Sequence, residues 1–292
     1  MSPGPVDSNA VPGEDTPSSS RGGARTGLHR ALALTPLEGD GDGSFCFRLS
    51  IDDGWQQGRG AFGGLVLGAL AQAIEASEPD PARELRALTG QLPGPVPVGE
   101  SILRVVAVRR GTGASTWQAR LDHAGETLAV ATAVLGRARG DEAAADLQKR
   151  ATPGWSELPV APLGPPVAPR FLQHFELRPT GPLPFSGGEP RCEGFVRERA
   201  PPRRRTAADV IALSDVYWPT FLVGQSGPRA LATVSFSLQL MASPAALEPT
   251  EPLFHQAREL GRFGGFVAEQ RDLFTPDGAL VAVSLQTFAI VK

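Results

Sequence analysis

One carboxylate in the second half of the chain interrupts an apolar helical pattern. The segment 206–222 predicts a helix whose apolar stripe includes Ile211 and Trp218. Asp215 lies about 40° from Ile211 around the helix axis and projects from the same stripe. A buried carboxylate costs several kcal/mol unless hydrogen-bond donors face it. Such a group can hold a water or take a proton, and a structural pairing with an arginine fits the pattern equally well.

The end of the same helix is marked by a proline. Pro219 lies four residues after Asp215 and has no backbone N–H, so the Asp215 carbonyl loses its usual helical partner. We therefore expect the helix to bend or end near this point.

Two further polar residues lie in apolar segments that have the two-residue period of strands. In LATVSFSLQL, Thr233 falls on the polar positions, while the alternate positions from Val234 onward are apolar. In LVAVSLQTFAIV, Gln286 shares a mixed face with Ala282 and Phe288. A surface position accounts for either residue, and periodicity alone assigns neither a role.

A glycine motif precedes the first predicted helix. Gly58, Gly60 and Gly63 form G-x-G-x-x-G, but DDGWQQ precedes them instead of a buried parallel strand, so dinucleotide binding is disfavoured. These glycines instead allow a helix to pack tightly against a sheet, with Gly64 and Gly68 on one helix face. The free N–H groups at such a helix start can polarise a carbonyl.

Other catalytic patterns are weak. The segment 224–227 reads G-Q-S-G and lacks the spacing of a hydrolase nucleophile elbow. The four histidines show no paired metal-ligand spacing, so we expect no metal. A Ser-His-Asp triad is left open, although no residue nominates one.

The positions of glycine and proline divide the chain. We expect a disordered tail over 1–30, a first domain over 31–138, an extended proline-rich linker over 139–169 and a second domain over 170–292. In each domain, the sequence pattern predicts a strand, a long buried helix and then four antiparallel strands. In the first domain the helix covers 60–76.

The two domains read as a duplication. HAGETLAVATAVL (123–135) and PDGALVAVSLQTF (276–288) align with a glycine at each turn, at Gly125 and Gly278. This alignment pairs Gln286 with Ala133, so we do not expect a second set of active-site residues in the first half. The pattern predicts an α+β fold, with a sheet curled around one helix in each half.

Composition excludes several classes of protein. The net charge of −3 lacks the basic footprint of a nucleic-acid-binding protein, and five arginines in RERAPPRRR (197–205) are best explained by a solvated loop. Two cysteines exclude a disulfide framework, and no apolar run reaches 18 residues. The first 30 residues lack the apolar run of a secretory signal, so we expect a cytoplasmic protein without a membrane span.

The second half resembles the TesB-like acyl-CoA thioesterases. The resemblance is carried by LSDVYWP (213–219), ATVSFSLQL (232–240) and GGFVAEQRDLFTPDGALVAVSLQTF (264–288), and GAFGGLVLGALAQA (60–73) is similar to the first half of that family. It implies a double hotdog, in which two tandem domains each wrap a sheet around a long helix. It also implies hydrolysis of acyl-CoA to a free acid and CoA, with no cofactor.

The resemblance also implies site residues. The family's catalytic Asp, Thr and Gln match Asp215, Thr233 and Gln286, which would hold the attacking water. Gly63 and Gly64 would supply N–H groups to the substrate, and Trp218 would contact it.

Two alternatives are carried forward. A catalytically silent hotdog protein that binds acyl chains, or assists assembly, would bind ligand without hydrolysing it. A hotdog dehydratase or hydratase is ranked below it because the D-x4-N-P-x-H type of signature is not found. Because hotdog sheets have exposed edges and faces, we expect a homo-oligomer.

Overall fold

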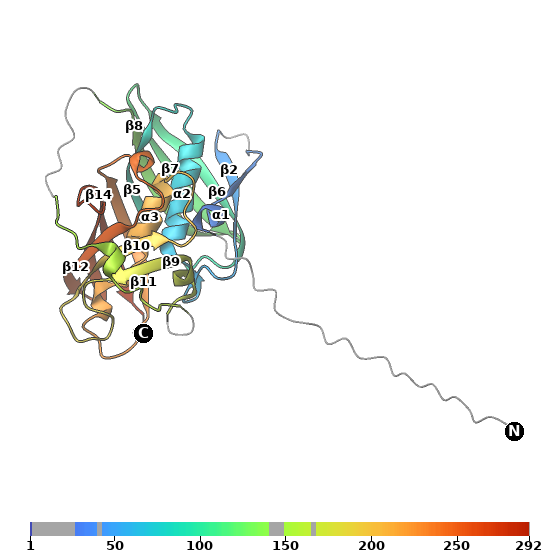
Figure 1. Ribbon diagram of the computed structural model, residues 1–292. Helices are drawn as coiled ribbons and strands as arrows, with labels where there is room; N and C mark the ends of the chain where they lie inside the picture. The colour runs from blue at the N-terminus through green and yellow to red at the C-terminus, as the bar shows by residue number, and fades with distance from the viewer. Residues whose placement is uncertain (2–26, 40–42, 140–148, 165–167, 292) are drawn as a thin grey trace.

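The computed structural model describes residues 1, 27–39, 43–139, 149–164 and 168–291. The first half contains the predicted series of elements, in which strands with one buried face follow a long helix (Figure 1). These elements are α1 (Leu28–Ala31), β1 (Leu34–Leu37), β2 (Phe45–Ile51), β3 (Gln56–Gln57), β4 (Gly60–Ala61), α2 (Gly63–Ser77), β5 (Glu84–Gln91), β6 (Gly99–Arg110), β7 (Ala114–His123) and β8 (Glu126–Gly136).

The second half repeats this order. Its elements are β9 (Phe175–Pro179), β10 (Arg191–Glu198), α3 (Ala207–Asp215), β11 (Leu231–Leu240), β12 (Leu253–Phe263), β13 (Phe266–Phe274) and β14 (Leu280–Ile290). Short 3-10 turns lie at Trp155–Glu157, Arg170–His174, Thr220–Leu222 and Pro244–Ala246. The matching order supports the duplication inferred from the sequence.

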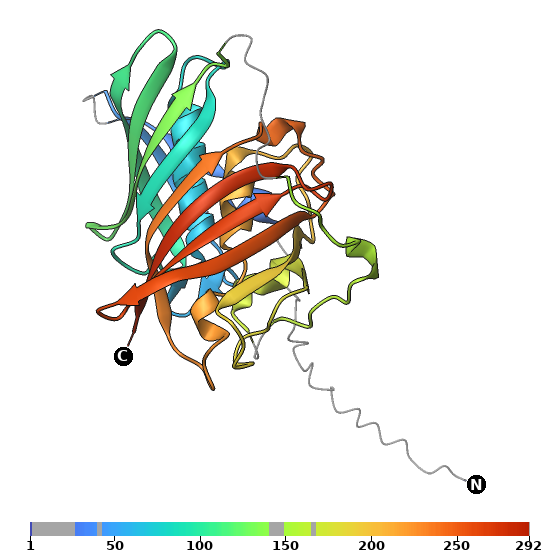
Figure 2. The same cartoon turned by 90° about the vertical axis from the view of Figure 1, so that its left-hand side faces the viewer.

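All the long strands join one antiparallel sheet of 12 strands, in the order β1-β2-β6-β7-β8-β5-β11-β14-β13-β12-β10-β9. The halves meet where β5 pairs with β11, with Thr89 opposite Ser237. The sheet curves around α2 and α3, which lie side by side against its concave face (Figure 2). The α+β architecture predicted from the sequence is confirmed, with one continuous sheet in place of two separate ones.

The two helices are antiparallel and unusually close. A Cβ atom at Gly64 would lie 2.9 Å from the Ala212 Cα, and one at Gly68 would lie 3.0 Å from the Ala208 carbonyl oxygen. Small residues on both helices permit this approach, which places the start of α2 beside the end of α3.

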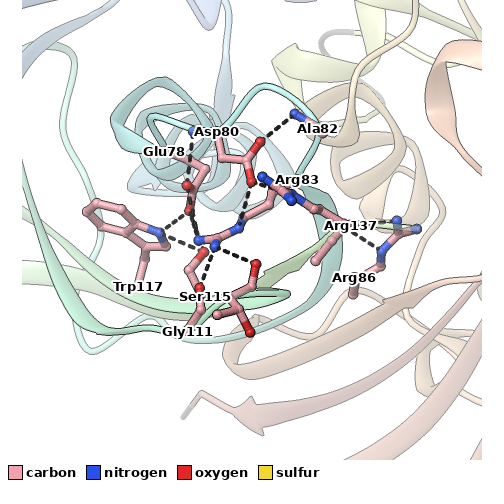
Figure 3. Close-up of polar contacts among 11 residues, drawn as sticks. Glu78, Asp80, Ala82, Arg83, Arg86, Gly111, Ser115, Trp117 and Arg137 are labelled. Atoms are coloured by element: carbon pink, nitrogen blue, oxygen red, sulfur yellow. Dashed lines mark hydrogen bonds and ion pairs between the residues drawn. The ribbon is translucent and has the colours of Figure 1, made fainter. Parts of the chain in front are cut away.

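The far end of α2 is fixed by a polar network (Figure 3). The Glu78 carboxylate accepts hydrogen bonds from the Ser115 hydroxyl and, at 2.9 Å, from Trp117 Nε1. Arg83 lies 3.3 Å from Glu78 and 3.1 Å from Asp80. Burial alone would raise the pKa of Glu78, but these donors and Arg83 hold it below its usual value. The network ties the end of α2 to β7.

Two sequence predictions need correction at their boundaries. Leu28–Arg30, expected in the disordered tail, belong to α1, because Leu28 is buried in the core; residues 2–26 lie outside the described chain. The helix expected over 206–222 ends at Asp215, and a separate 3-10 turn begins at Thr220. The break lies where Pro219 removes a helical donor.

Within the described residues, no helix is long and apolar enough to span a membrane. Part of the linker lies against the second half, where Arg150 bonds Gln256 at 2.7 Å and Glu193 at 3.1 Å.

A buried carboxylate at the end of β10 makes folding stability depend on pH. Glu198 is 3% exposed, and neither of its carboxylate oxygens has a hydrogen-bond partner among the described residues. Burial raises the pKa of Glu198 to about 8, with Asp209 adding to the rise and Arg205 opposing it. The folded state therefore binds this proton more tightly than the unfolded state, and stability falls as pH rises from about 4.5 to about 8.

We predict that Glu198→Gln removes this dependence, since the amide keeps the shape of the side chain without its charge. In urea unfolding between pH 5 and pH 7, the free energy of unfolding of the wild type should fall relative to the variant by about 1.4 kcal/mol per pH unit. Glu157→Gln, at an exposed position, should follow the wild type. Parallel curves for Glu198→Gln and the wild type would contradict the prediction.

Candidate active site

Asp215 is the last residue of α3 and lies beside the first residues of α2. It is 5% exposed, and its Oδ1 lies 3.5 Å from Arg271 Nη1. A Cβ atom at Gly63 would lie 3.0 Å from its Oδ2, which has no hydrogen-bond partner among the described residues. The missing side chain of Gly63 therefore leaves room for this buried carboxylate oxygen next to the helix start.

The electrostatic surroundings of Asp215 leave it close to the balance between its two protonation states. Burial raises its pKa to about 6, while Arg271, Gln286 and the backbone N–H of Gly64 act in the opposite direction. Glu269 adds to the rise. At neutral pH the group is largely ionised, and it can still accept a proton, as a general base requires.

Gln286 lies on the inner face of β14, next to Asp215. It is 2% exposed, whereas its neighbour Leu285 is 47% exposed, so the mixed face seen in the sequence is the buried one. The amide lowers the pKa of Asp215, but neither of its polar atoms has a hydrogen bond of good geometry to another described residue. A buried amide with unused donor and acceptor capacity can bind a small polar ligand such as water.

Thr233 faces the same side of the sheet because of a β-bulge. The register of β11 on β14 shifts between Thr233 and Ser235, so Val234 is the extra residue and Thr233 lies opposite the buried Phe288. Simple alternation had placed Thr233 with the solvent-facing polar positions, and the bulge turns it inward.

A pocket of about 380 Å³ opens at this place, between the halves of the chain. Gly63 at the start of α2 and Thr233 on β11 both line it, and Arg59 contributes a charged side chain. Most of the remaining lining is apolar, including Ala61, Val66, Leu92, Pro95, Val96, Pro219, Leu231, Val234, Phe288 and Val291. Such a lining suits an apolar chain with a polar group near the helix start.

A second and larger hollow, of about 670 Å³, lies on the outer face of the first half. It is lined by outward-facing residues of β6 and β7, such as Arg104, Gln118 and Arg120. No residue of the Asp215 group borders it, so size does not identify the site here. Among the described residues, no group of three or more His, Cys, Asp or Glu side chains is placed to hold a metal ion.

The sequence matches family models over nearly the whole described fold. Residues 51–136 match the acyl-CoA thioesterase N-terminal domain, and residues 142–290 match the acyl-CoA thioesterase C-terminal domain. The chain belongs to the acyl-CoA thioesterase family. No curated protein sequence matches this chain.

Solved structures agree on the fold. A hotdog-fold protein of unknown function from Alicyclobacillus acidocaldarius is 23% identical, with a TM-score of 0.81 over 91% of this chain and 98% of its own. The acyl-CoA thioesterase II TesB2 of Mycobacterium marinum is 19% identical, with a TM-score of 0.71 over 90% and 98%. The tesB protein of Mycobacterium avium subspecies paratuberculosis is 16% identical, with a TM-score of 0.70 over 91% and 98%. The resemblance to TesB-like acyl-CoA thioesterases and the hotdog fold are thus confirmed.

Within this thioesterase fold, the residues predicted from the sequence fall into two sets. Asp215, Gln286 and Gly64 come together at the helix start, and Gly63 and Thr233 line the adjoining pocket. Trp218 is 9% exposed, packs against Tyr217 and is not among the pocket-lining residues. Its contact with substrate stays a prediction.

Sequence reasoning missed two charged residues behind Asp215. Glu269 and Arg271 are almost fully buried, and Arg271 Nε donates to Glu269 Oε1 at 2.5 Å. In β13 they continue the two-residue spacing of the apolar Val267 and Leu273, so a strand-period reading of this segment would have placed them on the same buried face.

We predict that Gly63→Ala lowers thioesterase turnover by on the order of tenfold or more, because its Cβ would displace the Asp215 carboxylate. Gly68→Ala is the matched control on the same helix, since its Cβ would meet the Ala208 carbonyl at a similar 3.0 Å but no carboxylate. Turnover and thermal unfolding of both variants should be measured together. Equal losses of activity in the two variants would place the effect in helix packing and contradict the prediction.

Proposed function

We propose that this protein hydrolyses acyl-CoA thioesters to a free carboxylic acid and CoA, with Asp215 as the general base. The observation that carries the proposal is a buried carboxylate with a pKa of about 6, one oxygen of which has no hydrogen-bond partner among the described residues and lies beside Gly63, which lines an apolar pocket. Family membership supports a thioesterase activity, and the acyl-CoA substrate follows from the family's description.

The remaining groups suit the same reaction. Thr233 and the amide of Gln286 would share the attacking water with Asp215, and the N–H groups of Gly63 and Gly64 would stabilise the negative charge on the thioester oxygen. The start of α2 has no side-chain cap, so no capping side chain occupies its first N–H groups, and the Gly64 N–H also faces Asp215.

The proposed reaction needs neither a metal nor a covalent intermediate. The water oxygen bonds to the thioester carbon while its proton passes to Asp215. Collapse of the tetrahedral oxyanion breaks the C–S bond, and the departing CoA sulfur takes the proton from Asp215. The carboxylate is thereby regenerated, and the acid and CoA leave the pocket.

We expect purified protein to release free thiol from at least one member of a panel of acyl-CoAs, and Asp215→Asn to lose at least about a hundredfold of this activity. Because the base must be ionised, turnover should fall below about pH 6 and level off above it. Thiol release at pH 5 to 8 measures both effects. Full activity in Asp215→Asn would exclude this residue as the base.

A silent acyl-binding protein is the alternative function. It would bind acyl-CoA, seen by calorimetry, with no thiol release at any chain length or pH. That result would reject hydrolysis. Homo-oligomerisation and a cytoplasmic location are kept as predictions that sedimentation and cell fractionation can test.

Arg59 is the charged residue among those that line the pocket, and it is exposed near the bend between β3 and β4. We predict that it attracts the phosphate groups of CoA, so that Arg59→Ala raises KM for acyl-CoA several-fold with little change in kcat. The effect should shrink at high salt. Arg109→Ala, an exposed arginine that does not line the pocket, is the control. An unchanged KM in Arg59→Ala would contradict the prediction.

A further inference from the structure

Arg271 forms a buried link between Asp215 and the sheet behind it. Its side chain is 1% exposed, and its Nη1 lies 3.5 Å from Asp215 Oδ1 and 3.3 Å from the Ser214 carbonyl oxygen. Its Nε donates to Glu269 Oε1 at 2.5 Å. The guanidinium therefore joins the end of α3 to β13 through charged contacts on both sides.

Glu269 is itself held by the turn that follows α3. Its Oε2 accepts hydrogen bonds from the Thr220 backbone N–H at 2.8 Å and the Thr220 hydroxyl at 2.7 Å. Thr220 directly follows Pro219, which lines the pocket. A chain of polar contacts thus runs from the pocket-lining turn through Glu269 and Arg271 to Asp215.

The fold does not require these charges. Burying an ion pair is costly, and apolar residues of similar size often serve folding as well or better. The duplicated first half makes the comparison directly. Gln286 lies opposite Glu269, and its counterpart Ala133 lies opposite Trp117. By the same register, Arg271 corresponds to Ala119.

The helices show the same asymmetry. Counted from their first residues, Gly63 and Ala207, the two helices have Gly64 equivalent to Ala208 and Gly68 equivalent to Ala212. The same count makes Ala71 the equivalent of Asp215. The first half has alanine at the helix position of Asp215 and also lacks the glutamate and the arginine at the matching strand positions, although its helix carries Glu75 elsewhere. The three charged residues therefore occur together or not at all in the two copies.

We propose that Arg271, oriented by Glu269, is a positioning residue that holds the Asp215 carboxylate ionised and aimed at the pocket. This rests on the proposed role of Asp215 as the general base. Arg271 acts through Asp215 and does not line the pocket. Its guanidinium can face two acceptors at once, whereas a lysine ammonium offers a single compact charge.

The groups packed around Asp215 leave Arg271 as its main positive partner. Glu269 on β13 opposes ionisation, while the Gly64 N–H on α2 and Gln286 on β14 favour it. On β12, His255 stays neutral, because burial and then Arg271 lower its pKa far below the usual value. On β10, burial raises the pKa of the Cys192 thiol, which stays protonated. Without Arg271, two buried carboxylates would face each other.

The test compares Arg271→Met with Arg205→Met in pH profiles of kcat/KM. Arg205 is also 1% exposed, but it bonds the carbonyls of Pro249 and Glu251 away from the pocket. We expect Arg271→Met to move the acidic limb of the pH profile upward by at least one pH unit, with a roughly threefold or greater loss at pH 6.5 that is partly recovered at pH 9. Arg205→Met should keep the wild-type limb. An unmoved limb in folded Arg271→Met would overturn the proposal.

Arg271→Lys guards against a folding failure of the methionine variant. Lysine keeps the charge but not the two-sided geometry, so the limb should stay near its wild-type position while kcat falls severalfold. If the acidic limb of Arg271→Lys instead moves upward as far as that of Arg271→Met, the positioning role is overturned.

A direct titration separates this proposal from the proposed function. Carboxyl ¹³C NMR of Asp215, assigned with Asp215→Asn, reports its ionisation whether or not acyl-CoA is hydrolysed. Absence of turnover in the wild type would reject hydrolysis alone. An Asp215 titration that is the same in the wild type and Arg271→Met would reject the role of Arg271 alone.

Discussion

The close contact between α2 and α3 fixes the geometry of the whole candidate site. Gly64 and Gly68 on one helix face Ala208 and Ala212 on the other, with room for no additional Cβ atoms. Because the helices are antiparallel, the C-terminal carboxylate of α3 lies at the N-terminal end of α2, where the helix dipole favours negative charge. Larger side chains in this contact would move the carboxylate away from the N–H groups that face it. Packing and electrostatics are therefore set by the same small residues.

The sequence predicted the order of elements well, because strand and helix periods differ clearly and turn glycines recur in both halves. It also pointed to Asp215, because a carboxylate on an apolar stripe is unusual, and to the end of the helix, because proline removes a donor. The face of Thr233 could not be predicted in this way. A single bulge at Val234 reverses the alternation, and it becomes visible only in the register of β11 on β14.

Long-range pairing was the other limit of the sequence reasoning. The junction of β5 with β11 makes one sheet from two similar halves, and no local pattern in either strand specifies that partner. Glu269 and Arg271 depend on the same kind of information. Their two-residue spacing with Val267 and Leu273 places them on a buried face, but only the folded chain brings Arg271 to Asp215, which lies 56 residues earlier in the sequence.

The asymmetry of the duplicated fold explains why one site is built from both halves. The first half supplies an uncapped helix start at Phe62–Gly63, and the second half supplies Asp215. At the opposite end of the helix pair, a capping box between Thr206 and Asp209 covers the start of α3. The backbone N–H groups of both residues are therefore already hydrogen-bonded. The α2 residue at the position equivalent to Asp215, which would face the start of α3, is Ala71 and carries no carboxylate. Only one end of the helix pair therefore places a buried carboxylate beside an open helix start, so the site itself desolvates one such carboxylate and not two.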